Sequence, residues 1–289
     1  MSKPVGRGLC VGLNSVDPKR YGDWEGKLIA CEADARSMGR LLMAQNFEVT
    51  TLTTRSATAD AIFAEVRRLA ALSNPGDLAV ITCSSHGGQI PDRNGDELDG
   101  LDETTCAYDR EIIDDEWYAA FAAFRAGVRV LFISDSCHSG TLSRLLSNKP
   151  ALAASGVKSM PWDVCRDAYD QNREMYDRIL AAKPTRARDV QANVLLLGGC
   201  QDEQLSYDGL SNGAFTAALL ASWSNGANNY CYKTFHAAID RRMNGGGGWR
   251  SLFTSFGRAL GRYSPTAQNP SYYWVNRDAK FEASKPFTV

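Results

Sequence analysis

Net charge, histidine and long apolar runs are all scarce in this sequence of 289 residues. Its 32 basic and 33 acidic residues give a formal net charge of −1, so nothing favours nucleic acid or an anionic membrane as a partner. No apolar run approaches the roughly 20 residues that a membrane helix needs, and no apolar segment of signal-peptide length opens the chain. We therefore expect no membrane association.

Several sequence motifs are also missing. There is no GxGxxG and no phosphate-binding loop, which argues against a nucleotide-binding protein. The α/β-hydrolase pattern GxSxG occurs once, at 209–213. None of the eight cysteines forms a Cys-x-x-Cys pair, and several lie within apolar runs. Such thiols behave as small buried hydrophobes in a reducing compartment, so we predict no disulfide framework and a cytoplasmic location.

Apolar residues make up 44% and charged residues 22% of the chain, which is enough for a sizeable core. Apolar runs predict six strands, at 8–13, 47–52, 77–83, 128–134, 193–199 and 271–275. Helical spacing predicts helices at 30–45, 58–72, 114–125, 166–182, 213–223 and 233–243. Strands that alternate with helices and are apolar on both faces indicate a mostly parallel sheet covered on two sides.

The pattern weakens between residues 142 and 190, where Ser, Lys, Arg, Pro and Ala dominate. We therefore divide one composite domain into a first region (1–141), a connector or inserted loop (142–190) and a last region (191–289).

Residues that could carry chemistry follow two of the predicted strands. His86 lies in Ser-Ser-His-Gly-Gly-Gln and Cys137 in Asp-Ser-Cys-His-Ser-Gly. Ligands bind at the carboxyl ends of strands in such sheets, and an imidazole there could activate a thiol. Taken alone, a cysteine at a strand end is more often a buried hydrophobe, and a histidine before Gly-Gly is commonly a loop residue. His138 adjoins Cys137, but neighbours on an extended chain point to opposite faces, which favours His86 as the base.

These two motifs resemble the histidine and cysteine motifs of the metacaspases, a branch of the caspase-like cysteine peptidases. Further segments match that family in order, at 12–14, 28–35, 94–103, 113–116, 201–207 and 212–216. The resemblance implies a caspase-like three-layer α/β fold without a prodomain, and a cysteine endopeptidase. It makes Cys137 the nucleophile and His86 the general base, with the backbone amides of Gly87 and Cys137 as the oxyanion hole.

Metacaspases cleave protein or peptide substrates after Arg or Lys, and the family's pocket falls on Cys31, Asp34, Ser84 and Asp135 of this chain. Local geometry agrees, because Ser84 and Asp135 each precede a catalytic residue by two positions and so share its strand face. A substrate guanidinium would compensate the buried carboxylates.

The family's calcium ligands match Asp102, Asp114 and Asp115, but Arg144 stands where a fourth acid is usual. We expect that no cofactor is required and that calcium binds weakly or not at all. A solvated acidic loop would explain the same acids.

Two alternatives stay open. Ser85 replaces the usual Gly before His86, and with Arg144 this leaves room for a caspase-like pseudoenzyme that binds partners. The basic residues of the connector are explained either by self-cleavage or by solvation. We expect a monomer.

Overall fold

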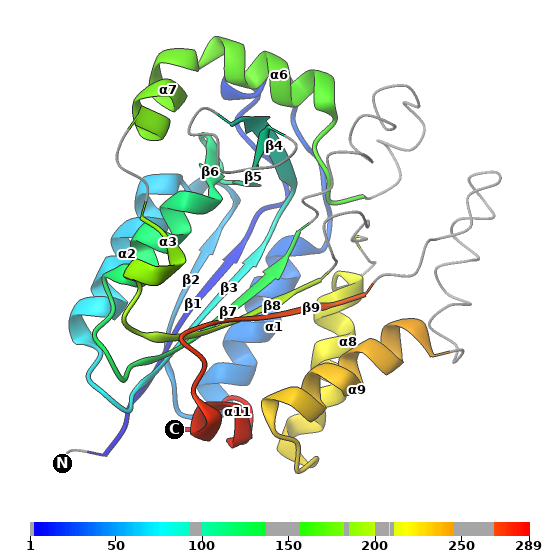
Figure 1. Ribbon diagram of the computed structural model, residues 1–289. Coiled ribbons are helices and arrows are strands. Elements are labelled where there is room, and N and C mark those ends of the chain that lie inside the picture. Colours follow the sequence, from blue (N-terminus) through cyan, green and yellow to red (C-terminus); the bar gives the residue numbers. More distant parts are fainter. Residues whose placement is uncertain are drawn as a thin grey trace.

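The computed structural model describes residues 3–92, 100–136, 157–181, 185–199, 208, 211–245 and 269–289. A six-stranded sheet with the order β2-β1-β3-β7-β8-β9 forms its centre (Figure 1). All its neighbouring strands are parallel except β8 and β9, which are antiparallel. The strands are β1 (Gly6–Gly12), β2 (Glu48–Thr53), β3 (Leu78–Ser84), β7 (Arg129–Asp135), β8 (Asn193–Gly198) and β9 (Ser271–Val275). All six predicted strands are confirmed to within two residues at each end.

Helices cover both faces of this sheet (Figure 1). Helices α2 (Ala59–Leu72) and α3 (Asp114–Ala122) lie on one face. The other face carries α1 (Cys31–Ala44), α8 (Ala214–Trp223), α9 (Tyr232–Asn244) and the short α11 (Ala279–Ala283). Within the described ranges, four further turns are 3₁₀ helices, at Pro18–Arg20, Thr54–Ser56, Ala187–Asp189 and Ser224–Gly226.

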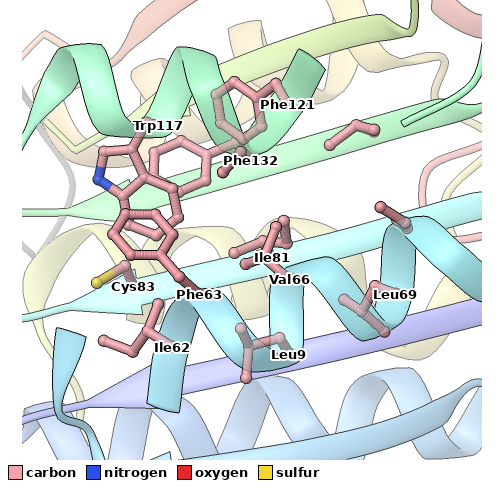
Figure 2. Packing of buried hydrophobic residues seen from close by; sticks show 14 of the residues in the cluster. Leu9, Ile62, Phe63, Val66, Leu69, Ile81, Cys83, Trp117, Phe121 and Phe132 are labelled. Carbon is pink, nitrogen blue, oxygen red and sulfur yellow. The ribbon is translucent and has the colours of Figure 1, made fainter. Parts of the chain in front are cut away.

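Successive residues of the central strands point into opposite cores. On β3, Ile81 belongs to the core under α2 and α3, whereas Val80 belongs to the core under α1 and α8. An aromatic group fills the first core, where Trp117 packs against Phe63 and Phe132 with ring centroids 5.4 and 4.7 Å apart (Figure 2). These two cores hold the ends of β3 and β7 in place.

A second, three-stranded antiparallel sheet has no counterpart in the sequence-based prediction, which placed a loop there. It consists of β4 (Gly87–Pro91), β5 (Leu101–Cys106) and β6 (Glu111–Ile113). Helices α6 (Trp162–Gln171) and α7 (Arg173–Ala181) lie over it (Figure 1). The sequence predicted one helix here. Two helices form instead, because the first one ends at Asn172, whose φ of −114° and ψ of 20° are not helical.

The second half of the connector is therefore packed structure. Tyr169, Tyr176 and Leu180 are buried against Ile90 and Ile113 of the small sheet. This packing fixes the connector beside β4, the strand that follows His86.

No helix in the described part of the chain is both long and apolar enough to cross a membrane. Six cysteines of the described residues are free thiols: Cys10, Cys31, Cys83, Cys106, Cys165 and Cys231. Cys137 and Cys200 lie outside the described residues.

Candidate active site

The two strand ends that carry the predicted catalytic residues are neighbours in the sheet. Strands β3 and β7 are parallel, and Ser84 pairs with Asp135 in their register. His86 lies two residues after Ser84 in the sequence, and Cys137 lies two residues after Asp135. The chain therefore leads to both residues from paired positions on adjacent strands. Cys137 itself lies outside the described residues, as do His138 and Arg144.

His86 is buried and has a defined tautomer. Its Nε2 lies 3.1 Å from the carbonyl oxygen of Gly26, which can only accept, so Nε2 carries the hydrogen. Nδ1 therefore keeps its lone pair, and it has no hydrogen-bond partner among the described residues. Burial lowers the pKa of His86 to about 3, against the opposing effect of the hydrogen bond that its ring donates to the Gly26 carbonyl. The ring centroids of His86 and Trp24 lie 4.7 Å apart. His86 is thus a neutral base whose Nδ1 carries a free lone pair.

The backbone amide of Gly87, one of the two predicted oxyanion donors, is occupied. It donates a hydrogen bond of 3.0 Å to the carbonyl oxygen of Lys158. The carbonyl of Gly87 in turn accepts from the amide of Met160 at 2.7 Å, so that Ser159 pairs with Gly87 as a parallel bridge. The connector thus runs as an extended segment beside the residue after His86.

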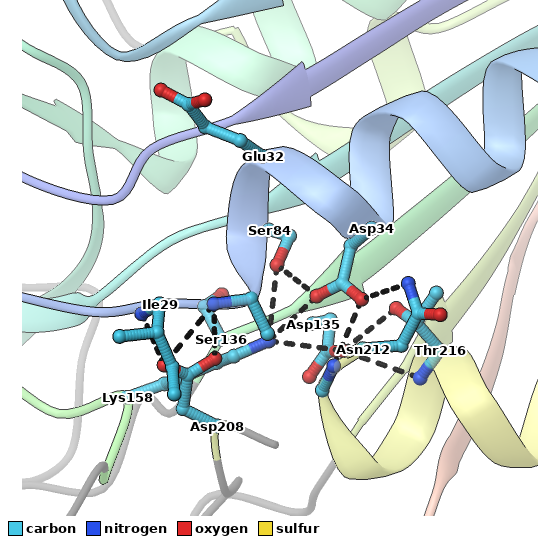
Figure 3. Close-up of polar contacts among 12 residues, drawn as sticks. Ile29, Glu32, Asp34, Ser84, Asp135, Ser136, Lys158, Asp208, Asn212 and Thr216 are labelled. Atoms are coloured by element: carbon cyan, nitrogen blue, oxygen red, sulfur yellow. Dashed lines mark hydrogen bonds and ion pairs between the residues drawn. The ribbon is translucent and has the colours of Figure 1, made fainter. Parts of the chain in front are cut away.

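The predicted pocket residues Asp34, Ser84 and Asp135 come together around the side chain of Lys158 (Figure 3). The Lys158 Nζ lies 3.1 Å from Oδ2 of Asp34 and 3.1 Å from Oδ2 of Asp135. It also donates to Oγ of Ser84 at 3.0 Å, and that hydroxyl donates to Asp34 at 2.7 Å. The Lys158 side chain is 0% exposed. The pocket is therefore built to hold a cation.

The charge state of Lys158 follows from its neighbours. Burial alone would lower the pKa of its ammonium, but the carboxylates of Asp135 and Asp34 outweigh burial and hold that pKa well above its usual value. Burial raises the pKa of Asp34, despite the attraction of Lys158. Removing one partner from such a buried pair typically costs about 3–5 kcal/mol.

Residues at the start of α8 orient both pocket carboxylates. Oδ1 of Asp34 accepts from Nδ2 of Asn212 at 2.9 Å and from the amide of Gly213 at 2.8 Å. Oδ2 of Asp135 accepts from Oγ1 of Thr216 at 2.7 Å. Asn212, Gly213 and Thr216 lie in a segment that matched the family motifs, but no role was predicted for them. Lys158 was predicted only as a connector charge.

Cys31, the fourth predicted pocket residue, is fully buried in the first turn of α1, three residues before Asp34. Burial raises the pKa of its thiol well above the ordinary value, so it stays neutral and packs as a small apolar group. Ala30, which precedes it, offers no side-chain cap; instead Asp208 accepts from the amides of Ile29 and Ala30 at 2.5 and 3.0 Å. Asp208 thereby fixes the start of the helix that carries Asp34.

The three acids predicted for calcium do not form a cluster. Asp102 is buried on β5, while Asp114 and Asp115 are half-buried in the first turn of α3. Within the described ranges, no three Asp, Glu, His or Cys side chains are close enough to hold a metal ion. Asp102, Asp114 and Asp115 therefore do not fit a calcium site by themselves.

The fold and the site together define an α/β protein of the caspase type. Residues 8–281 match the sequence profile of Peptidase C14, the caspase domain, and the chain belongs to this family of cysteine peptidases.

Two curated relatives are Metacaspase-1 of Mycosarcoma maydis, 27% identical over 268 residues, and Metacaspase-1 of Schizosaccharomyces pombe, 28% identical over 258 residues. These alignments cover 81% and 74% of this chain. The chain spans only 65% and 57% of the lengths of these relatives.

Solved structures agree with the fold. A crystal structure of a Geobacter sulfurreducens protein is 43% identical, with a TM-score of 0.84 and 99% of both chains covered. Caspase-1 of Spodoptera frugiperda is 13% identical, with a TM-score of 0.57 over 94% of this chain and 86% of that one. At 13% identity this second likeness concerns the fold alone.

Proposed function

We propose that the protein is an endopeptidase that cleaves peptide bonds after Arg or Lys through Cys137 and His86. The observation that carries the proposal is the buried pocket in which Asp34, Ser84 and Asp135 hold an ammonium group. Two carboxylates would be costly to bury without a cation, and a substrate Arg or Lys supplies one.

The proposed chemistry assigns one group to each step. His86 Nδ1 takes the proton of the Cys137 thiol, and the thiolate attacks the carbonyl carbon after the bound Arg or Lys. The Gly87 amide donates to the oxyanion that forms. The imidazolium then protonates the leaving amine, and water hydrolyses the thioester.

Peptides with Arg, Lys or Asp before a fluorogenic leaving group test the specificity. We expect turnover of the Arg and Lys peptides, and a fall in kcat/KM of about 100-fold or more for Asp34→Asn or Asp135→Asn, because a buried guanidinium loses its partner. Asp60→Asn, on the exposed side of α2, is the matched control. A preference of the wild type for the Asp peptide would overturn the assignment of the pocket.

The catalytic pair is tested by three alanine variants. Cys137→Ala and His86→Ala should each abolish turnover while leaving the circular dichroism spectrum unchanged, because nucleophile and base act as a unit. His138→Ala should keep substantial activity. Loss of activity in His138→Ala together with a fully active His86→Ala would show that the base is misassigned.

A binding protein without activity is the second candidate, favoured by one observation: Lys158 already fills the pocket. A permanently filled pocket would exclude substrates. This alternative predicts no turnover of any peptide by the wild type or by a variant in which Lys158 is neutral, whereas the peptidase predicts turnover by both.

A further inference from the structure

A tryptophan in the loop 21–28 packs against the imidazole of His86. The ring centroids of Trp24 and His86 lie 4.7 Å apart, and the two ring planes meet at 59°, a favourable arrangement for an aromatic pair. Trp24 is half-buried, whereas His86 is only 5% exposed. Part of the indole therefore faces solvent while another part covers the imidazole.

The same indole lies against Gly26, whose carbonyl oxygen accepts the hydrogen bond from Nε2 of His86 at 3.1 Å. A Cβ atom at Gly26 would lie 2.8 Å from two carbon atoms of the Trp24 ring, so this close approach requires glycine. The φ of Gly26, +53°, also lies in the left-handed region that favours glycine. Trp24 thus packs on both the acceptor that fixes the tautomer of His86 and the ring that donates to it.

Hydrogen bonds anchor the backbone that carries Trp24. Its amide donates to the carbonyl of Tyr21 at 3.0 Å, and the hydroxyl of Tyr21 donates to the carbonyl of Ala107 at 2.8 Å. The amide of Gly22 donates to Oε1 of Gln171, at the end of α6, at 3.3 Å. The position of the indole on the imidazole is therefore set by the loop as well as by the ring contact.

We propose that Trp24 is a positioning residue for the general base: its indole holds the imidazole of His86 against the Gly26 carbonyl and keeps water away from it. The inference rests on the proposed function, in which His86 is the base, and it gives a role to Trp24, for which the sequence motifs predicted none. With Nε2 held on the carbonyl, the lone pair of Nδ1 remains available to the nucleophile. Without the indole, water reaches the ring, and both its tautomer and its charge are free to change.

Burial, more than nearby charge, controls the charge state of His86. Burial is the main cause that lowers its pKa to about 3, and the ammonium of Lys158 lowers that pKa further. Glu25 and Lys27 in the same loop form an ion pair with each other. Cys106, whose amide donates to the His86 carbonyl, keeps a neutral thiol because burial raises the pKa of that thiol. Exposure to water should therefore raise the pKa of His86 towards its ordinary value of about 6.5.

Nitrogen-15 NMR of the imidazoles tests this role without relying on activity. The chain has three histidines, so the signals of His86 can be assigned by comparison with His86→Gln. In the Cys137→Ala background, we expect His86 to carry its hydrogen on Nε2 and to stay neutral down to about pH 5. Trp24→Ala should let His86 titrate near pH 6.5, about its ordinary pKa, and populate both tautomers. Trp24→Phe keeps a ring on the imidazole and should resemble the parent chain.

Trp162→Ala is the matched control, because Trp162 is another half-buried tryptophan that packs on the same group of apolar residues as Trp24. It should leave the tautomer and the pKa of His86 as they are in the parent. Trp24→Leu keeps apolar bulk without a ring, and it should raise the pKa of His86 as Trp24→Ala does. Thermal melting shows which chains fold, and Trp24→Leu decides the question if the alanine chain does not.

Steady-state kinetics with an Arg peptide gives a second measurement. Trp24→Ala should lower kcat about 10-fold or more while KM changes less than about twofold, because the indole packs on the base whereas the pocket binds the substrate side chain. Its kcat/KM should also fall as the pH drops through about 6.5, where protonation of the imidazole removes the base. Trp24→Phe should retain most of the wild-type activity.

The outcomes separate the inference from the proposed function. An unchanged tautomer and an unchanged pKa of His86 in Trp24→Ala and Trp24→Leu would overturn the inference, whatever the activity of the wild type. An equal shift in Trp162→Ala would show a general loosening of the packing and would also overturn it. If the NMR changes are as expected but the wild type turns over no peptide, the placing of the ring by Trp24 is supported and the proposed function is overturned.

Discussion

Gly213 is the residue at which the pocket has least room. A Cβ atom there would lie 2.3 Å from Nζ of Lys158, 2.7 Å from Oδ2 of Asp135 and 3.0 Å from Oδ2 of Asp34. Its φ of −57° is open to any residue, so it is space and not backbone strain that requires glycine. The absent side chain leaves the volume that the cation fills.

Gly213→Ala should therefore narrow the pocket without disturbing the backbone. We expect kcat/KM for an Arg peptide to fall about 10-fold or more, since overpacking costs about 1–3 kcal/mol. Steady-state kinetics measures the effect, with Gly39→Ala as the control, because a Cβ at Gly39 meets only Thr51 at 3.3 Å and Val49 at 3.7 Å. Wild-type turnover by Gly213→Ala would show that the cation binds elsewhere.

At the scale of elements, the small sheet carries a buried acid next to the active site. Glu111 on β6 is 0% exposed and accepts a hydrogen bond from Thr104. Its Oε2 would lie 2.7 Å from a Cβ atom at Gly88, one residue beyond the oxyanion donor. Burial raises the pKa of Glu111 from 4.5 to about 8.

This acid should make stability depend on pH. Between pH 4.5 and about 8 the folded chain holds a proton that the unfolded chain has lost. The free energy of unfolding therefore falls as pH rises through this window, by at most about 1.4 kcal/mol per pH unit. Urea unfolding of the Cys137→Ala chain at pH 5 and pH 8 measures the fall, which Glu111→Gln should reduce and the exposed Glu174→Gln should not. An equal fall in all three chains would place the titration elsewhere.

The acids that match the family's calcium ligands lie on strand β5 and in the first turn of helix α3. Since Arg144 replaces an acid of the family's calcium set, and the acids of the described residues do not cluster, we expect the same peptidase activity with calcium and with a chelator. Arg144→Asp should then gain a calcium requirement. Activation of the wild type by micromolar calcium in a titration would contradict this expectation.

At the scale of the whole molecule, the sequence predicted the elements whose buried residues follow a regular pattern. The apolar runs on β3 and β7 are buried on both faces, so their period and length identified them. The small sheet was not predicted, because its strands Gly87–Pro91 and Leu101–Cys106 mix glycine, proline and acidic residues with apolar ones. The resemblance to the metacaspases placed Asp34, Ser84 and Asp135 in one pocket, and the two-residue spacing placed Ser84 and Asp135 on the same strand faces as His86 and Cys137. Lys158 was not predicted to lie in the pocket, because a lysine in a polar connector is ordinarily solvated. Only its contact with two distant carboxylates marks it as buried.

The two parts of the chain on either side of Lys158 share one sheet and both cores, so they should associate even without the peptide bond between them. Strand β8 pairs with β7 from Arg129↔Asn193 to Ser134↔Gly198, and Leu195 and Leu197 are buried in the core under α1 and α8. Each such side chain contributes about 1.5–3 kcal/mol on burial.

We expect segments 1–158 and 159–289, co-expressed as separate chains, to elute together in size-exclusion chromatography and to part only in denaturant. Leu195→Asp should abolish the association, because it buries a carboxylate in that core. Separate elution of the unmodified pair would show that the peptide link, and not the shared sheet, holds the two regions together.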